Sequence, residues 1–149
     1  MSTFDLSTGY AGGTSFEALT KRRTEKMEVA IPLTGVTSDI VKTMPIKAGT
    51  LVHGIKLVVT SLATATTITM DIGVADTAVT GYDIDGFDAS VSGTAAVGTV
   101  TRSVPADAYP VIGGFYFVAD GTIDITLSTI TAMTVAPAFD LFVDCEDLS

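Results

Sequence analysis

From residue 27 to the C-terminus, apolar and polar side chains alternate with a period of two in a series of short runs. The clearest runs cover residues 50–61 and 66–74. Threonine occurs 24 times and mostly stands beside valine and isoleucine. Side chains branched at Cβ have a restricted χ1 angle and pack well on a pleated surface, so they favour strands. The alternation therefore predicts strands with one buried face and one exposed face.

Turn signals separate these runs at intervals of about ten residues, which is typical of a sandwich or barrel. The strongest is Asp120-Gly121, which predicts a hairpin, and Asp85-Gly86 marks a tight turn inside an expected loop over residues 75–93. The expected strands are residues 27–31, 36–44, 50–61, 66–74, 97–103, 110–119, 122–128 and 139–145. No helical pattern lies between them, so we expect an all-β fold: a single antiparallel β-sandwich, jelly-roll-like, with an immunoglobulin-like sandwich left open by the spacing.

Residues 1–26 differ from the rest and are predicted to form an N-terminal arm, with the β-sandwich domain over residues 27–149. Thr14 and Glu17 have the spacing of a capping box, which predicts a short helix over residues 15–26, the alternative being an extended arm. The apolar face of that helix is thin, so it would have to dock on the body or on a partner.

The charges are unevenly distributed along the chain. The net charge is −9, and from residue 57 onward there are twelve acidic residues and one basic residue, Arg102. A strongly acidic body repels phosphate backbones, so no nucleic-acid partner is expected. Four of the remaining basic residues fall within six positions: Lys21, Arg22, Arg23 and Lys26.

Further classes are excluded by what the chain lacks. No apolar run approaches the roughly 20 residues of a membrane helix, and no secretory signal is seen at the N-terminus, so no membrane partner is expected. The single cysteine, Cys145, allows no intrachain disulfide and fits assembly in a reducing cytoplasm.

Two residues could carry nucleophilic chemistry. His53, the one histidine, stands mid-strand on the face that Ile55 and Leu57 share, which favours a packed or interface residue. Cys145 lies between two acidic residues, which would raise the pKa of a thiol, so an inert cysteine is expected. Phosphate-binding, acyl-transfer and metalloprotease motifs are absent, so the sequence predicts neither an enzyme nor a cofactor.

An acidic run is the best candidate for a metal site. Asp83, Asp85 and Asp88 offer the carboxylate oxygens that calcium prefers, with Gly86 among them. The run departs from the EF-hand pattern, because no glutamate stands at the twelfth position. A solvated acidic hairpin tip is the preferred interpretation, so no metal is expected.

Several segments resemble small structural proteins of tailed bacteriophages. They are a strand entry at residues 45–52 (Pro-x-x-Ala-Gly-Thr-Leu-Val), a threonine-rich run at residues 64–76 and the hairpin at residues 120–127. Over residues 44–127 the chain is similar to capsid decoration (head cement) proteins and related minor head proteins. The resemblance implies a β-sandwich on the outer capsid surface of the virion, made in the host cytoplasm. It also implies the major capsid protein as partner and a homo-oligomer, with a trimer favoured.

The resulting hypothesis is a non-enzymatic structural protein that stabilises the capsid by bridging major capsid subunits. Such proteins often anchor through an N-terminal arm, although an ordinary frayed terminus is the alternative. The candidate arm residues combine positive charge with two apolar anchors: Phe16, Leu19, Lys21, Arg22, Arg23 and Lys26. The alternative function is a receptor- or glycan-binding module of a phage tail or fibre, which four tyrosines and no tryptophan make less favourable.

Overall fold

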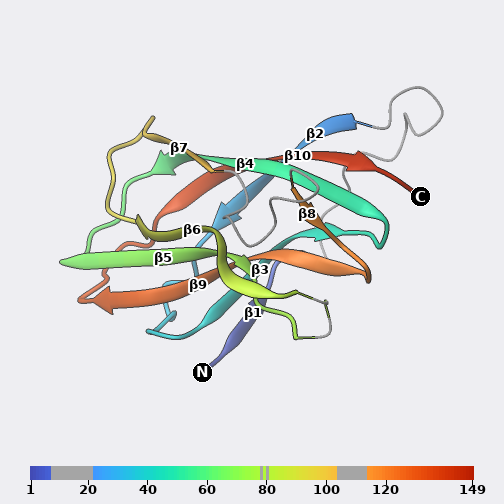
Figure 1. Cartoon of the computed structure of the whole chain (residues 1–149). Coiled ribbons are helices and arrows are strands. Elements are labelled where there is room, and N and C mark those ends of the chain that lie inside the picture. Colours follow the sequence, from blue (N-terminus) through green and yellow to red (C-terminus); the bar gives the residue numbers. More distant parts are fainter. Residues whose placement is uncertain (8–21, 78, 80, 104–113) are drawn as a thin grey trace.

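The computed structural model describes residues 1–7, 22–77, 79, 81–103 and 114–149. Within these ranges the chain forms ten strands and no α-helix (Figure 1). The strands are β1 (Thr3–Asp5), β2 (Arg22–Ala30), β3 (Ile40–Ile46), β4 (Thr50–Ser61), β5 (Thr67–Val74), β6 (Asp83–Ser92), β7 (Val100–Ser103), β8 (Phe115–Tyr116), β9 (Gly121–Thr131) and β10 (Ala138–Asp147). The described part includes no helix with the length and hydrophobicity that a membrane span requires.

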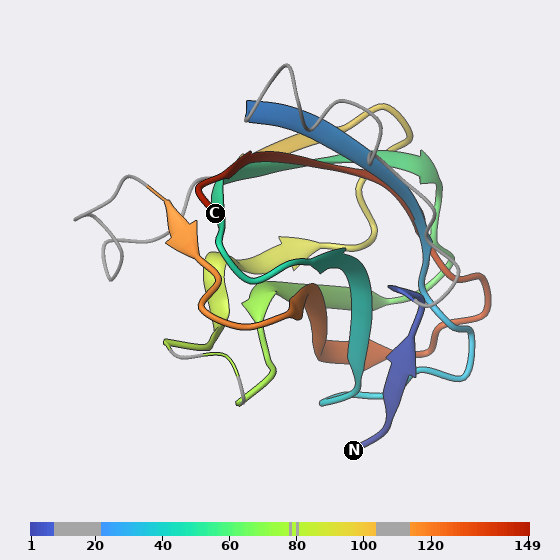
Figure 2. The ribbon, with the colours of Figure 1, turned by 90° about the vertical axis from the view of Figure 1, so that its right-hand side faces the viewer.

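The strands form two sheets that pack face to face (Figure 2). One, here the β4 sheet, has the order β2-β10-β4-β7, and β8 pairs with the free part of β4. The other, the β9 sheet, has the order β1-β3-β9-β5-β6. The predicted all-β sandwich is confirmed.

Nested pairing identifies the topology. β2 pairs with β10, β3 with β9, β4 with β7 and β5 with β6, all antiparallel. This is one long hairpin folded across two sheets, which is the arrangement of a jelly roll. The strand spacing left an immunoglobulin-like sandwich open, and the pairing decides for the jelly roll.

The core lies between the sheets and follows the alternation in the sequence. In β10, Phe139, Leu141 and Val143 are buried while the residues between them are not. Each such side chain contributes about 1.5–3 kcal/mol when it leaves water. The rings of Phe115 and Phe117 pack with centroids 4.9 Å apart near one end of the core.

The boundary of the N-terminal arm needs correction. The strand expected from residue 27 begins at Arg22, so the predicted helix is wrong over residues 22–26, while residues 15–21 lie outside the described residues. The β2 backbone pairs with β10 from Arg22 to Ala30, and this long-range pairing outweighs the weak local helix signal. Near the terminus, β1 pairs in parallel with β3 and so belongs to the sandwich. The division into arm and body otherwise stays a prediction.

Other strand boundaries also differ from the expectation. Residues 83–92, expected within a loop, form β6, whose pairing with β5 contains two register shifts. The shifts disturb the period of two, which is why the strand was missed. Gly73 allows this irregular pairing, because a Cβ there would lie 2.1 Å from the carbonyl oxygen of Asp83.

Candidate functional site

Basic side chains gather on the outer face of the β4 sheet, here called the basic face. Arg22 and Lys26 come from β2, Lys56 from β4 and Arg102 from β7, and together they are half of the chain's eight lysines and arginines. The residues that follow Lys26 and Lys56 in the chain, Met27 and Leu57, point into the core. The alternation therefore places these cations on one surface of a protein whose net charge is −9.

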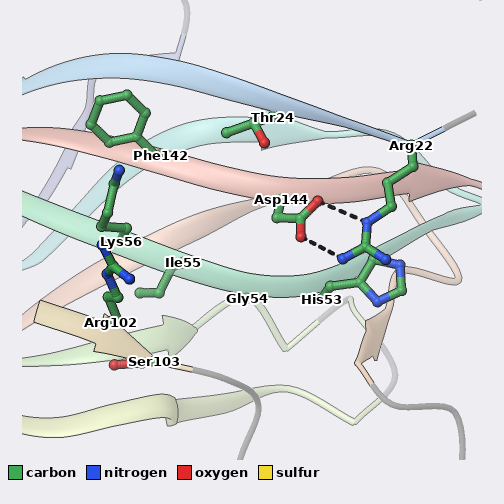
Figure 3. A pocket seen from close by; sticks show the side chains of 10 residues that line it. All are labelled: Arg22, Thr24, His53, Gly54, Ile55, Lys56, Arg102, Ser103, Phe142 and Asp144. Atoms are coloured by element: carbon green, nitrogen blue, oxygen red, sulfur yellow. Dashed lines mark hydrogen bonds and ion pairs between the residues drawn. The ribbon is translucent and has the colours of Figure 1, made fainter. Parts of the chain in front are cut away.

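An open groove of about 550 Å³ runs across this face (Figure 3). Its lining comes from β2, β4, β7 and β10. Gly54 contributes no side chain to the floor, and Phe142 supplies the aromatic surface. The groove therefore combines one aromatic ring with surrounding cations.

A β-bulge places His53 in this groove. Asp144 pairs with Gly54 while the next residue, Cys145, pairs with Val52, so His53 has no direct partner across the ladder. Its Nε2 lies 3.0 Å from a carboxylate oxygen of Glu146. The expectation that His53 shares the face of Ile55 and Leu57 is wrong. The extra residue of a bulge interrupts the alternation, so the His53 side chain points to the opposite face of the sheet.

Cys145 faces the core on the opposite side of the same sheet and is 1% exposed. Burial raises the pKa of its thiol to about 11, with smaller contributions from nearby acidic residues such as Glu25 and Asp144. The acidic neighbours identified in the sequence do raise the pKa of the Cys145 thiol, as expected, but burial raises it more. The thiol stays protonated at neutral pH.

Two ion pairs join β2 to β10 across the basic face. Arg22 donates from Nε and Nη2 to the two carboxylate oxygens of Asp144, at 3.2 and 2.7 Å. These hydrogen bonds hold the pKa of Asp144 below its usual value. Lys26 Nζ lies 3.1 Å from Asp140. Such exposed pairs contribute little to stability, but they orient the side chains.

Phe142 lies between the two halves of the basic face. Lys56 Nζ is 4.3 Å from the centroid of its ring, and Lys26 Nζ is 5.9 Å away. Both distances are within the range of cation–π contacts. Phe142 thus links the cation of β2 to the cation of β4.

The structure places the candidate arm residues as follows. Arg22 and Lys26 lie on the basic face, whereas Arg23 points to the inner side of β2 and pairs with Glu25. Phe16, Leu19 and Lys21 lie outside the described residues. Because side chains alternate along β2, Arg23 lies on the opposite face of the strand from Arg22 and Lys26.

The acidic run divides into two parts. Asp88 accepts a hydrogen bond from the Ser103 hydroxyl of β7. Asp83 and Asp85 interact with each other, and a hydrogen bond to Asp83 raises the pKa of Asp85. Within the described ranges no group of three or more His, Cys, Asp or Glu side chains is arranged to hold a metal ion.

Two buried carboxylates were not found from the sequence. Asp124 is 1% exposed and accepts hydrogen bonds from the Thr122 hydroxyl and the Ala75 amide. Burial raises its pKa to about 6. Asp39 accepts hydrogen bonds from the Val36 and Ser2 amides, which lower its pKa. A lone acid amid apolar residues, as in 123–125, is the signal that could have indicated Asp124.

A second surface lies at the end of the sandwich where four connectors meet, β2–β3, β4–β5, β6–β7 and β9–β10, at the left of Figure 1. Backbone hydrogen bonds join connectors to each other, as from Thr64 N to Val135 O at 2.9 Å, or to a strand, as from Val59 N of β4 to Thr99 O at 3.0 Å. The exposed apolar side chains of this connector end are Leu33, Val36, Leu62, Val97 and Val135. The connector end is therefore an ordered surface with apolar side chains in water.

Comparison with known proteins gives similarity in structure alone. No protein-family model matches the sequence, and no curated protein sequence matches it. A chain in the capsid of Ralstonia phage GP4 superposes with a TM-score of 0.71 at 12% identity, covering 99% of this chain and 97% of that one.

Two further capsid structures contain similar chains. One is the cyanophage Pam1 capsid asymmetric unit, with a TM-score of 0.59, 16% identity and coverage of 94% and 95%. The other is the acid-stable capsid of Helicobacter pylori bacteriophage KHP30, with a TM-score of 0.53, 12% identity and coverage of 83% and 86%. At these identities the comparisons show that the fold is shared.

Proposed function

We propose that this chain is a non-enzymatic structural protein of a bacteriophage virion that binds the outer capsid surface and bridges neighbouring major capsid subunits. The observation that carries the proposal is the similarity to a chain of the Ralstonia phage GP4 capsid over 99% of this chain and 97% of that one. The similarity thus concerns the whole sandwich and not one shared hairpin.

The positions of the two residues best suited to nucleophilic chemistry support a structural role. His53 is held by Glu146, and Cys145 is buried with its thiol pKa raised to about 11. A nucleophilic thiol needs a lowered pKa and access to substrate, and Cys145 has neither. Both residues serve the packing and pairing of the β4 sheet.

The β2 edge of the basic face is the proposed capsid-binding surface. Arg22 and Lys26 stand there, directly after the candidate arm residues Phe16, Leu19 and Lys21. Each is paired with a carboxylate of β10, so an acidic partner would add to these pairs or exchange with them. The arm would add apolar anchors next to these charges.

Bridging requires a second surface, and the connector end provides one. Exposed apolar groups gathered in one place are typical of protein contact sites. Backbone hydrogen bonds hold the connectors together, so little conformational entropy would be lost on binding. Contact through both surfaces would add buried area across subunit boundaries and strengthen the shell against internal pressure. A trimer would place three such surfaces around one axis.

The experiment uses capsids assembled without this protein, mixed with the purified chain. Cosedimentation measures binding, and the temperature at which packaged DNA becomes accessible to a dye measures reinforcement. We expect saturable binding and a higher release temperature. Binding without any change in the release temperature would contradict the bridging role, and absence of cosedimentation would contradict the proposed function as a whole.

A further inference from the structure

Two cations of the basic face lie directly opposite each other without an acidic partner. Lys56 on β4 and Arg102 on β7 are register partners in an antiparallel ladder. Both side chains line the groove and lie close together there (Figure 3). Like charges at directly opposed positions repel each other and destabilise the sheet.

Of the carboxylates on the same face, Glu28 stands on the outer strand β2, and the other three are engaged in ion pairs. Asp144 is paired with Arg22, Asp140 with Lys26 and Glu146 with His53. Among the ion pairs of the described residues, none involves Lys56 or Arg102. The ring of Phe142 contacts Lys56 but carries no net charge. An anionic group bound between Lys56 and Arg102 would therefore reduce the repulsion between them.

The complementary feature lies on the other sheet, at the start of β6. The Asp85 backbone amide donates a hydrogen bond to the Asp83 carboxylate at 3.3 Å, and the two acidic side chains lie close enough for a hydrogen bond to Asp83 to raise the pKa of Asp85. Two exposed apolar side chains alternate with them in the sequence, Tyr82 at 51% exposure and Ile84 at 42%. The chain thus displays two cations beside an aromatic ring and two carboxylates beside exposed apolar groups.

We propose that the Lys56–Arg102 pair of one copy binds the Asp83–Asp85 carboxylates of a second copy. Each contact would neutralise two pairs of like charges at once. Because the two patches differ and lie on different sheets, the contact is head-to-tail and generates a closed ring when the rotation allows. The inference rests on the proposed function, since it names the contact that would hold the homo-oligomer together.

A second copy fits this site better than a nucleic acid does. The net charge of −9 repels a phosphate backbone, and the two free cations are too few to overcome that field. In a second copy both carboxylates lie at the start of β6, where Asp83 is paired with Val74 of β5. Little conformational entropy is then lost when the contact forms.

The test uses charge reversal and repair in the absence of capsids. One variant is Lys56→Glu/Arg102→Glu, and the other is Asp83→Lys/Asp85→Lys. Light scattering after size-exclusion chromatography gives the mass of each, and each should associate roughly tenfold or more weakly than the unaltered protein. The control Lys47→Glu removes an exposed cation that pairs with Asp120, and it should keep the mass of the unaltered protein.

Repair separates a direct contact from general effects of charge. In an equimolar mixture of the two variants, every contact between unlike chains joins opposite charges, so the mixture should associate more strongly than either variant alone. A ring with an odd number of members would still contain one contact between like charges, so the mixture should form pairs or even-membered rings. A chain that carries all four substitutions has opposite charges at every contact and should regain the mass of the unaltered protein. Association of the mixture should weaken as salt increases, because ions screen exposed charges.

Cross-linking of the unaltered protein gives a second readout. A carbodiimide joins a lysine amine to a carboxylate in contact with it, and mixing isotopically light and heavy protein marks links between copies. We expect mixed-isotope links from Lys56 to Asp83 or Asp85.

Two results would overturn the inference: reversed variants that keep the mass of the unaltered protein, or a mixture that does not associate. Either result leaves capsid binding, measured by cosedimentation, to be judged separately. Binding of a labelled DNA oligonucleotide that is lost only on reversal of Lys56 and Arg102 would assign the site to nucleic acid instead.

Discussion

Ser103 on β7 donates a hydrogen bond to Asp88 on β6, and this contact ties the edge strands of the two sheets together. The two strands follow one another in the chain but belong to different sheets. The hydroxyl and the carboxylate therefore close one side of the sandwich, next to the strand that carries Arg102.

Ser103→Ala should lower the free energy of unfolding by about 1–2 kcal/mol, because it removes a hydrogen bond to a charged and partly buried acceptor. Denaturant unfolding followed by circular dichroism measures the change. Ser92→Ala is the matched control, since Ser92 is exposed and the hydrogen bonds of its hydroxyl are to the nearby Thr94. Equal losses in the two variants would contradict a special role for the contact between the sheets.

Asp124 should make stability depend on pH. Its folded pKa of about 6 lies above its ordinary value of 3.8, so between these values the folded protein holds a proton that the unfolded chain releases. The contribution of Asp124 to stability therefore falls as pH rises through this window, by roughly 3 kcal/mol in total. Asp124→Asn cannot ionise and should be more stable than the unaltered protein above about pH 6, with the advantage shrinking toward about pH 4.

Thermal unfolding of both proteins across this pH range measures the effect. Asp120→Asn is the control with opposite sign, because hydrogen bonds from the Ala48 amide and Lys47 lower the pKa of Asp120. That carboxylate favours folding above its unfolded pKa, and the advantage is lost as pH falls through its folded pKa. A stability difference between Asp124→Asn and the unaltered protein that stays constant with pH would contradict the burial argument.

Reversing the charges at the β2 edge should weaken capsid binding. Arg22→Glu/Lys26→Glu places four acidic groups next to one another, with Asp140 and Asp144. We expect affinity for capsids to fall roughly tenfold or more, with the loss greatest at low salt. Cosedimentation across a salt series measures it, with Lys47→Glu as the control. A loss of binding that does not vary with salt would argue for unfolding of β2 and not for lost electrostatic attraction.

Gly73→Ala should be strongly destabilising. The new Cβ would lie 2.1 Å from the carbonyl oxygen of Asp83, so β5 and β6 would have to separate. Overpacking of this kind costs about 1–3 kcal/mol or more. Gly98→Ala is the comparison: its φ of +87° strains an alanine, but nothing lies within 4 Å of the added Cβ. A smaller loss for Gly73→Ala than for Gly98→Ala in denaturant unfolding would contradict the close approach.

The sequence predicts well those elements in which one face is buried and the other exposed. β5 and β10 alternate without interruption, and their expected positions are confirmed. The predicted strand at residues 27–31 begins too late, because the first residues of β2 are charged and spaced as in a helix. β6 was missed because its register shifts break the period.

The basic face could be predicted only in part. Arg22 and Lys26 stand out as a charge cluster in the sequence, and their exposure follows once β2 is recognised. The position of His53 depends on a bulge that leaves no sequence signal. The juxtaposition of Lys56 and Arg102 depends on the register between β4 and β7, which long-range packing determines.

The nested pairing also governs the order in which the protein can be completed. β10 lies between β2 and β4, so these two strands have no common neighbour until β10 has been synthesised. Until then both expose unpaired edges, which are sites for pairing with other chains. Such late closure between distant segments is slow. Only a chain translated through β10 can close the β4 sheet and display the complete basic face.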